Sequence, residues 1–154
     1  MLMHLFQIHA RLGELQYMAA TTSGLAGGSY QKHMAEALKR FSRSIELCDD
    51  YLRGYYGLKL VRSSLSGGGM AADVSQISKK LLDDGAKAIK QTDDSEFTLP
   101  DTSTIERLNE LATAKLSEIV RHSAANDHGW RGYSEAEIAA ARELLAEDVS
   151  AIER

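Results

Sequence analysis

The sequence has very little cysteine and very little proline, and each scarcity excludes a class of structure. Cys48 is the only cysteine in 154 residues, so an intrachain disulfide and a CxxC metal site are both excluded. A single cysteine also favours a reducing compartment. Pro100 is the only proline, and runs rich in Val, Ile and Thr are absent. With 44% apolar and 26% charged residues, the composition predicts an all-α globular protein of one domain.

Long hydrophobic runs are also absent, which bears on any membrane association. No stretch reaches 18 apolar residues, so no membrane-spanning helix is predicted. The N-terminus lacks a basic n-region, and polar residues interrupt its apolar run, so it is a poor signal peptide. We therefore expect membrane contact only through partners.

The net charge of −4 is too small to indicate a nucleic-acid partner. Its distribution is uneven, because residues 32–62 hold seven basic and four acidic residues, whereas residues 134–154 hold six acidic and two basic ones. The simplest interpretation is that both segments contribute solvated helix faces.

Apolar residues recur at helical spacing in six segments, and each segment predicts a helix. The predicted ranges are 2–19, 31–48, 51–64, 72–91, 104–122 and 135–152. In the first range the periodic positions are Leu5, Ile8, Leu12, Leu15 and Met18 or Ala19. No capping residue precedes that helix, which we interpret as the start of a piece of a longer chain.

Local signals predict where three of these helices begin. Ser103–Glu106 and Ser134–Glu137 fit the S-x-x-E capping box, in which two side chains satisfy the free amides of a first turn. Asp49 or Asp50 suits the N-cap of the helix over 51–64. The connections are rich in glycine at 20–30 and 64–70, and acidic at 91–102.

Residues 37–58 partly fit the tetratricopeptide pattern of two antiparallel helices in about 34 residues. Ala37 and Phe41 stand at its A-x3-F positions, Ser44 takes the next small position, and Tyr55 takes the aromatic site of the following repeat. Asp49 replaces the usual proline. These positions predict tetratricopeptide-like hairpins in which Phe41 and Tyr55 fill the gap between stacked units.

Four segments of the chain read HARLGELQYMAA, ALKRFSRSIELCDDYLRGYYGLKL, LNELATAKLSEIV and YSEAEIAAARELL. Together they resemble the subunit 2 family of the ER membrane protein complex, in its fungal form. The resemblance covers residues 5–65 and 104–147 and corresponds to the C-terminal half of the family. Residues 66–103 match nothing in it, and its N-terminal repeats are absent here.

The resemblance implies a tetratricopeptide-like α–α superhelix that acts as a non-catalytic cytosolic scaffold. Its partners would be other subunits of the ER membrane protein complex, and it would lie on the cytosolic face of the ER membrane and support insertion of transmembrane segments. We divide the chain into helices over 1–65, an insertion with one helix and an acidic linker over 66–103, and a helical hairpin over 104–154. Such a scaffold predicts poor stability in isolation and large exposed apolar surfaces at the N-terminal end, where the preceding repeats would pack.

Two groups of residues are candidates for protein–protein contact. Arg53, Tyr56 and Lys59 combine side chains that often anchor interfaces, and the alternative is that one tyrosine packs in the core. Trp130 and Tyr133 precede the last helix and form either a hydrophobic staple or an exposed docking patch.

No residue is assigned a catalytic, metal-binding or cofactor-binding role. The five histidines show no convergent ligand spacing. Ser123, Asp127 and His128 could form a triad only on paper, because no nucleophile elbow is recognisable. The glycine-rich segments lack the lysine of a phosphate loop. Cys48 is interpreted as a small core residue rather than a reactive thiol.

Two other functions remain open. One is a stand-alone tetratricopeptide adaptor of the co-chaperone kind, which binds a peptide carboxylate with Lys and Asn side chains. The first helix offers only Arg11 for this purpose, and no asparagine precedes Asn109. The other is an enzyme with a helical active site, for which the apolar helix faces show no titratable cluster.

Overall fold

The computed structural model describes residues 4–22, 28–67, 99–130 and 132–152. Within these ranges the chain is helical and has no strand, which confirms the all-α prediction. Its elements are α1 (Leu5–Thr22), α2 (Gly28–Leu47), α3 (Leu52–Gly67), α5 (Thr102–Ala124), the 3₁₀ helix η3 (His128–Trp130) and α6 (Glu135–Ile152). The helix predicted over 72–91 lies outside the described residues. Among the described helices, none is long and apolar enough to cross a lipid bilayer.

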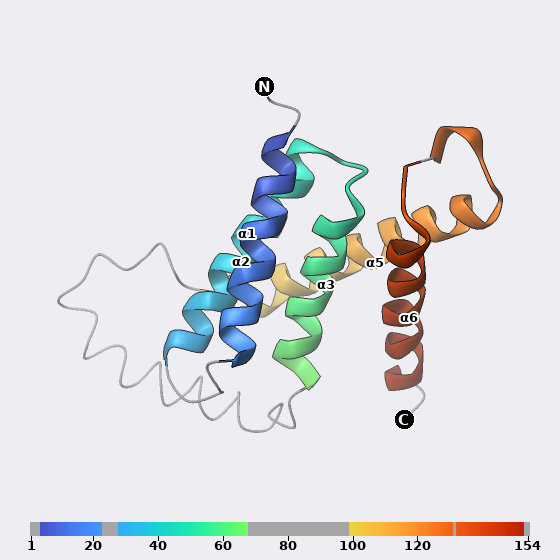
Figure 1. The fold of residues 1–154 in the computed structure, drawn as a ribbon. Helices are drawn as coiled ribbons and strands as arrows, with labels where there is room; N and C mark the ends of the chain where they lie inside the picture. The colour runs from blue at the N-terminus through green and yellow to red at the C-terminus, as the bar shows by residue number, and fades with distance from the viewer. Residues whose placement is uncertain (1–3, 23–27, 68–98, 131, 153–154) are drawn as a thin grey trace.

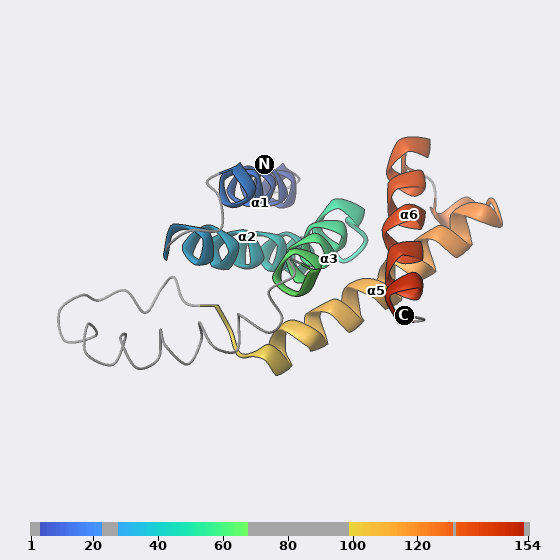
Figure 2. The same ribbon diagram turned by 90° about the horizontal axis from the view of Figure 1, so that it is seen from below.

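The helices stack in chain order, so that each packs on the next. α1, α2 and α3 run side by side as successive antiparallel helices (Figure 1). α5 crosses on the side of α2 and α3 that faces away from α1, and α6 lies beside its C-terminal half (Figure 2). All five α-helices contribute buried residues to one core cluster, so the predicted segments over 1–65 and 104–154 share a single hydrophobic core.

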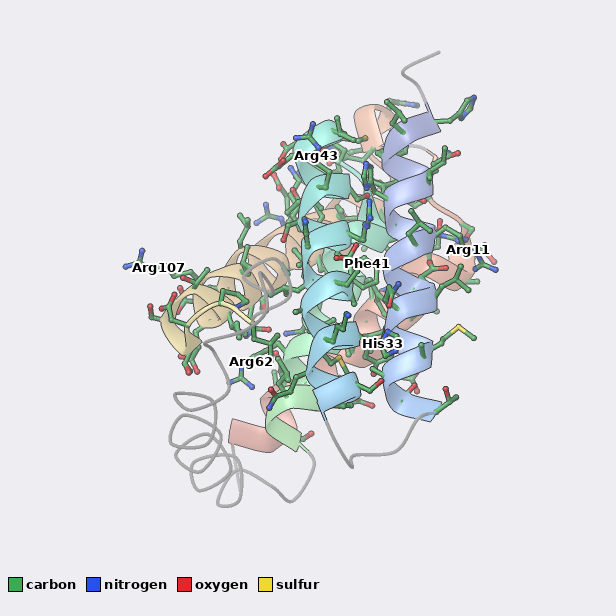
Figure 3. The ribbon with its side chains drawn as sticks, turned by 90° about the vertical axis from the view of Figure 1, so that its left-hand side faces the viewer. Arg11, His33, Phe41, Arg43, Arg62 and Arg107 are labelled. Carbon is green, nitrogen blue, oxygen red and sulfur yellow. The ribbon has the colours of Figure 1, made fainter. Side chains whose placement is uncertain are left out.

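Small residues allow α1, α2 and α3 to approach one another around Phe41, whose side chain is 1% exposed. A Cβ added to Gly13 of α1 would lie 2.9 Å from the Phe41 ring, and one added to Gly57 of α3 only 2.2 Å from it. Figure 3 shows Phe41 at this junction. The Ser44 hydroxyl donates a hydrogen bond to the Phe6 carbonyl oxygen at 2.9 Å, which ties α2 to α1. Phe41 thus fills the space between neighbouring helices.

The two predicted capping boxes have different outcomes. At α6 the prediction is confirmed, because the Ser134 hydroxyl accepts from the Glu137 amide at 3.2 Å and the Glu137 carboxylate accepts from the Ser134 amide at 3.0 Å. The box predicted at 103–106 is wrong, since α5 begins two residues before its predicted start and Asp101 caps it. The Asp101 carboxylate accepts from the Thr104 amide at 3.2 Å.

The acidic residues in the turn between α2 and α3 form ion pairs with α5 and do not cap α3. Tyr51 is the residue before α3, so neither Asp49 nor Asp50 occupies the predicted capping position. The Tyr55 hydroxyl donates to the carboxylate of Asp49 at 3.0 Å. Lys115 of α5 lies 3.4 Å from the Asp49 carboxylate and 3.2 Å from that of Asp50.

Candidate protein-interaction surfaces

α1 turns its small residues inward and its large apolar residues outward. Ala10, Gly13 and Ala20 are buried against the neighbouring helices. The periodic apolar positions on the other side are exposed by 37% to 56%; we call them the outer α1 stripe, and they are Leu5, Ile8, Leu12, Leu15 and Met18. A contiguous set of exposed large apolar side chains is typical of a protein contact surface. α1 therefore presents large apolar side chains to solvent along one side.

A cleft of about 480 Å³ lies next to this stripe, where α1, the start of α3 and the segment before α6 meet. Four polar side chains, two tyrosines, one leucine and one glycine line it: Gln7, Arg11, Tyr51, Leu52, Arg53, Gly132, Tyr133 and Glu137. Arg53 and Tyr133 were both predicted as interaction residues, and the structure brings them together here. We call this space the arginine cleft.

Four alternating charges join three helices along the arginine cleft. Arg11 Nη1 donates to Glu14 Oε2 at 2.7 Å within α1. Glu14 Oε1 lies 3.9 Å from Arg53 Nη1, and Arg53 Nε donates to Glu137 Oε1 of α6 at 2.8 Å. The start of α6 is therefore linked to α1 through Arg53.

The Glu137 carboxylate is held by several donors at once. Arg53 binds one of its oxygens, while the amide and hydroxyl of Ser134 bind the other at 3.0 and 3.2 Å. Partial burial would raise the pKa of Glu137, but these hydrogen bonds and the charge of Arg53 outweigh it, and the pKa is lowered. The hydrogen bond to Glu137 also raises the pKa of Arg53. Both groups therefore stay charged at neutral pH.

Aromatic side chains fix the backbone around the arginine cleft. The Tyr133 hydroxyl donates to the carbonyl oxygen of Asp50 at 2.7 Å, which anchors the segment before α6 to the α2–α3 turn. Tyr51 meets Phe6 of α1 edge to face, with ring centroids 4.7 Å apart. Gly132 has a φ of 123°, a conformation that favours glycine, and a Cβ there would have open space around it.

Trp130, another predicted interaction residue, lies beside a second cleft of about 260 Å³. Its indole stacks on the His122 ring with a centroid distance of 4.5 Å, and Lys115 Nζ lies 5.6 Å from the centroid of the Trp130 ring. Trp130 is half-buried and packs against the core. His122 Nδ1 lies 2.6 Å from a carboxylate oxygen of Asp127, which belonged to the triad considered above.

The prediction that Lys59 faces a partner is wrong. Its side chain is fully buried, and its ammonium group donates to Thr113 Oγ1 at 2.8 Å and to the carboxylate of Asp148. The physical reason is that α3 packs against both α5 and α6 at this position, so the basic residue points between helices. Tyr56 is half-buried and packs against the core, and this burial raises the pKa of its hydroxyl.

Sequence reasoning missed Gln7 and Tyr51, and weighed Arg11 only as a weak carboxylate ligand. These residues join Arg53 only because α1 packs beside the start of α3, which no local pattern indicates. Cys48 is half-buried. Within the described ranges no group of three or more His, Cys, Asp or Glu residues could hold a metal ion.

Comparison with other proteins does not place the chain in a family. It matches no protein-family model, no curated protein and no solved structure.

Proposed function

We propose that this protein is a non-catalytic helical scaffold of the ER membrane protein complex, which supports insertion of transmembrane segments through protein–protein contacts on the cytosolic face of the ER. The observation that carries the contact role is the outer α1 stripe. The choice of complex comes from the sequence resemblance. The position of Phe41 between Gly13 and Gly57 supports a tetratricopeptide-like array within the all-α fold.

The outer α1 stripe suits a partner that is itself helical. Its five side chains follow one another at intervals of three or four residues and span about 20 Å along the helix axis. An amphipathic helix with the same spacing would cover them by packing side by side with α1. α1 already packs in this way on α2 through its opposite face, so the partner helix would extend the existing stack of helices.

Exchange of Leu15 for glutamate tests this role, because Leu15 is 49% exposed and the change leaves the core intact. Leu111 of α5 is 50% exposed and supplies the matched control. The full chain would be expressed with a tag in fungal cells, and named subunits of the ER membrane protein complex would be quantified in the purified material. We expect these subunits to be lost from the material purified with Leu15→Glu and to remain in the material purified with Leu111→Glu. Circular dichroism should show that both variants are folded.

Two outcomes would contradict the proposal. If wild-type chain brings down none of the complex's subunits, the assignment to this complex is wrong. If Leu15→Glu retains them as well as Leu111→Glu does, the outer α1 stripe is not the contact surface.

A further inference from the structure

The arginine cleft holds more hydrogen-bond donors than acceptors. A guanidinium group carries five N–H donors. Within the described residues, Arg11 donates through Nη1 to Glu14, and Arg53 donates through Nε to Glu137. Both arginines therefore keep donors that can face the cleft, where the side-chain amide of Gln7 adds further donor capacity.

The two carboxylates at the arginine cleft, those of Glu14 and Glu137, already face its arginines. One Glu137 oxygen accepts from Arg53, and the other accepts twice from Ser134. Glu14 accepts from Arg11 on one oxygen and faces Arg53 with the other. A cationic ligand would have to break these pairs, whereas an anionic ligand could use the remaining donors without disturbing them.

We propose that the arginine cleft binds a carboxylate group of a partner polypeptide through the N–H donors of Arg11 and Arg53 that Glu14 and Glu137 leave unused. This inference rests on the proposed function, since it names the chemistry of a partner that contacts the scaffold. The carboxylate could belong to an acidic side chain or to a chain terminus, and both present the same planar pair of oxygens to a guanidinium group.

The size and walls of the cleft fit this ligand. A volume of about 480 Å³ is in the range of small-ligand sites. Tyr51 and Tyr133 offer aromatic walls to the residues next to the carboxylate, and Leu52 contributes an apolar surface. Glu14 and Glu137 offset the two arginines, so a singly charged carboxylate fits the local charge better than a phosphate dianion does.

The arginine cleft also adjoins the outer α1 stripe, because Arg11 immediately precedes Leu12 of that stripe. Arg11 projects from α1 on the far side from α2 (Figure 3), and 69% of its side chain is exposed. A partner segment lying along the stripe could therefore place an acidic group in the cleft. The stripe would supply apolar contact, and the carboxylate would fix the register of the partner.

Peptide titration of the isolated full-length chain tests the proposal. Three fluorescently labelled tetrapeptides would be compared: Leu-Ala-Leu-Ala with a free C-terminal carboxylate, the same peptide with a C-terminal amide, and an amidated Leu-Ala-Leu-Glu. We expect the first or the third to bind with a dissociation constant of about 0.1 mM, and the uncharged amide to bind at least about tenfold more weakly. The difference between the two acidic peptides identifies the source of the carboxylate.

Arg11→Gln and Arg43→Gln form the matched pair of variants. Both arginines are exposed and pair with a glutamate three residues later, at 2.7 and 2.8 Å, so each change removes one charge and one similar ion pair. Arg43 lies on α2 and does not line the cleft. We expect Arg11→Gln to weaken binding about tenfold and Arg43→Gln to leave it within about twofold. The amide NMR signals of Tyr51 and Gly132 should shift on titration.

The proposal is overturned if neither acidic peptide binds below about 5 mM, if the amide binds equally well, or if both variants weaken binding equally. It is also overturned if inorganic phosphate competes more strongly than acetate. These measurements need no other subunit, so their failure is distinct from the failure of the scaffold proposal, which is measured by subunit recovery from cells.

Discussion

Replacement of Asp148 should destabilise the protein, because it leaves the buried Lys59 without its charged partner. The Lys59 side chain is fully buried among α3, α5 and α6, and the Asp148 carboxylate is the group that balances its charge. In Asp148→Asn, Thr113 still accepts one hydrogen bond, but a hydroxyl group does not neutralise an ammonium ion. The variant therefore keeps an uncompensated charge inside the protein.

The size of the effect follows from the exposure of the two partners. Removal of one member of a fully buried ion pair costs about 3–5 kcal/mol. The Asp148 side chain is 38% exposed, so water already screens part of the pair. We therefore expect Asp148→Asn to lower the free energy of unfolding by about 2 kcal/mol, and Tm by about 4–8 °C.

A double-mutant cycle separates this cause from a loss of packing. Lys59→Met removes the buried charge and leaves Asp148 with access to water, so we expect it to cost less than Asp148→Asn. In the Lys59→Met background Asp148 no longer has a charge to balance, so Asp148→Asn should cost about 2 kcal/mol less there than in the wild-type protein. Urea unfolding followed by circular dichroism supplies the four free energies.

Hydrogen exchange locates the effect within the structure. The apolar contact of α6 with the rest is small, since Ile138, Ala141 and Leu144 are its buried hydrophobic residues within the described range. Amides of α6 should therefore lose protection before those of α2 in Asp148→Asn. The reasoning is refuted if Asp148→Asn unfolds within 0.5 kcal/mol of wild type, about the error of the method, or if the two substitutions are additive.

Three further predictions concern single positions. Gly57→Ala places a Cβ 2.2 Å from the Phe41 ring, so it should lower the free energy of unfolding in urea by about 1–3 kcal/mol, although alanine favours helices. As a control, a Cβ at Gly129 would have nothing within 4 Å, so Gly129→Ala should leave the free energy of unfolding nearly unchanged. Burial and two arginines of α2 lower the pKa of His9, so the unfolded chain takes up its proton first and stability should fall as pH drops below about 6.5. In thermal melts between pH 7.5 and 5.5, Tm should fall less steeply with decreasing pH in His9→Leu than in the wild-type protein. Hydrogen bonds from two hydroxyl groups and one amide lower the pKa of Asp101 to about 2. The helix cap that Asp101 forms should therefore persist in mild acid and be lost as pH falls from about 4 through 2. Asp101→Ala should lower Tm and remove hydrogen-exchange protection of the amides in the first turn of α5.

The sequence could predict α6 well because its start is decided locally. Ser134 and Glu137 satisfy each other's amides within one turn, and the predicted range 135–152 is the observed one. The start of α5 lies two residues before the predicted one, because Ser103 also fits a capping pattern. Asp101 caps instead, and its carboxylate accepts from the Thr104 amide.

The helical period of α1 identified its apolar stripe but not the direction in which the stripe faces. Alanine and glycine positions carry little hydrophobic signal, yet Ala10, Gly13 and Ala20 form the buried face because they allow close packing against α2 and Phe41. The large apolar side chains are then left on the outside. The apolar period of α1 would be the same whichever face of the helix packed on a neighbour, so the period does not tell the buried face from the exposed one.

Composition and local pattern thus determined that this protein is helical and where its described helices lie, to within three residues. Tertiary packing alone decided two facts that bear on function. Lys59 reads as a surface charge in the sequence, but α3, α5 and α6 enclose it. Arg11 and Arg53 are 42 residues apart, and they share a cleft because the start of α3 packs beside α1, with Gly132 and Tyr133 also lining the cleft. Long-range packing sets both results, because local interactions fix the backbone conformation but not which helix faces meet.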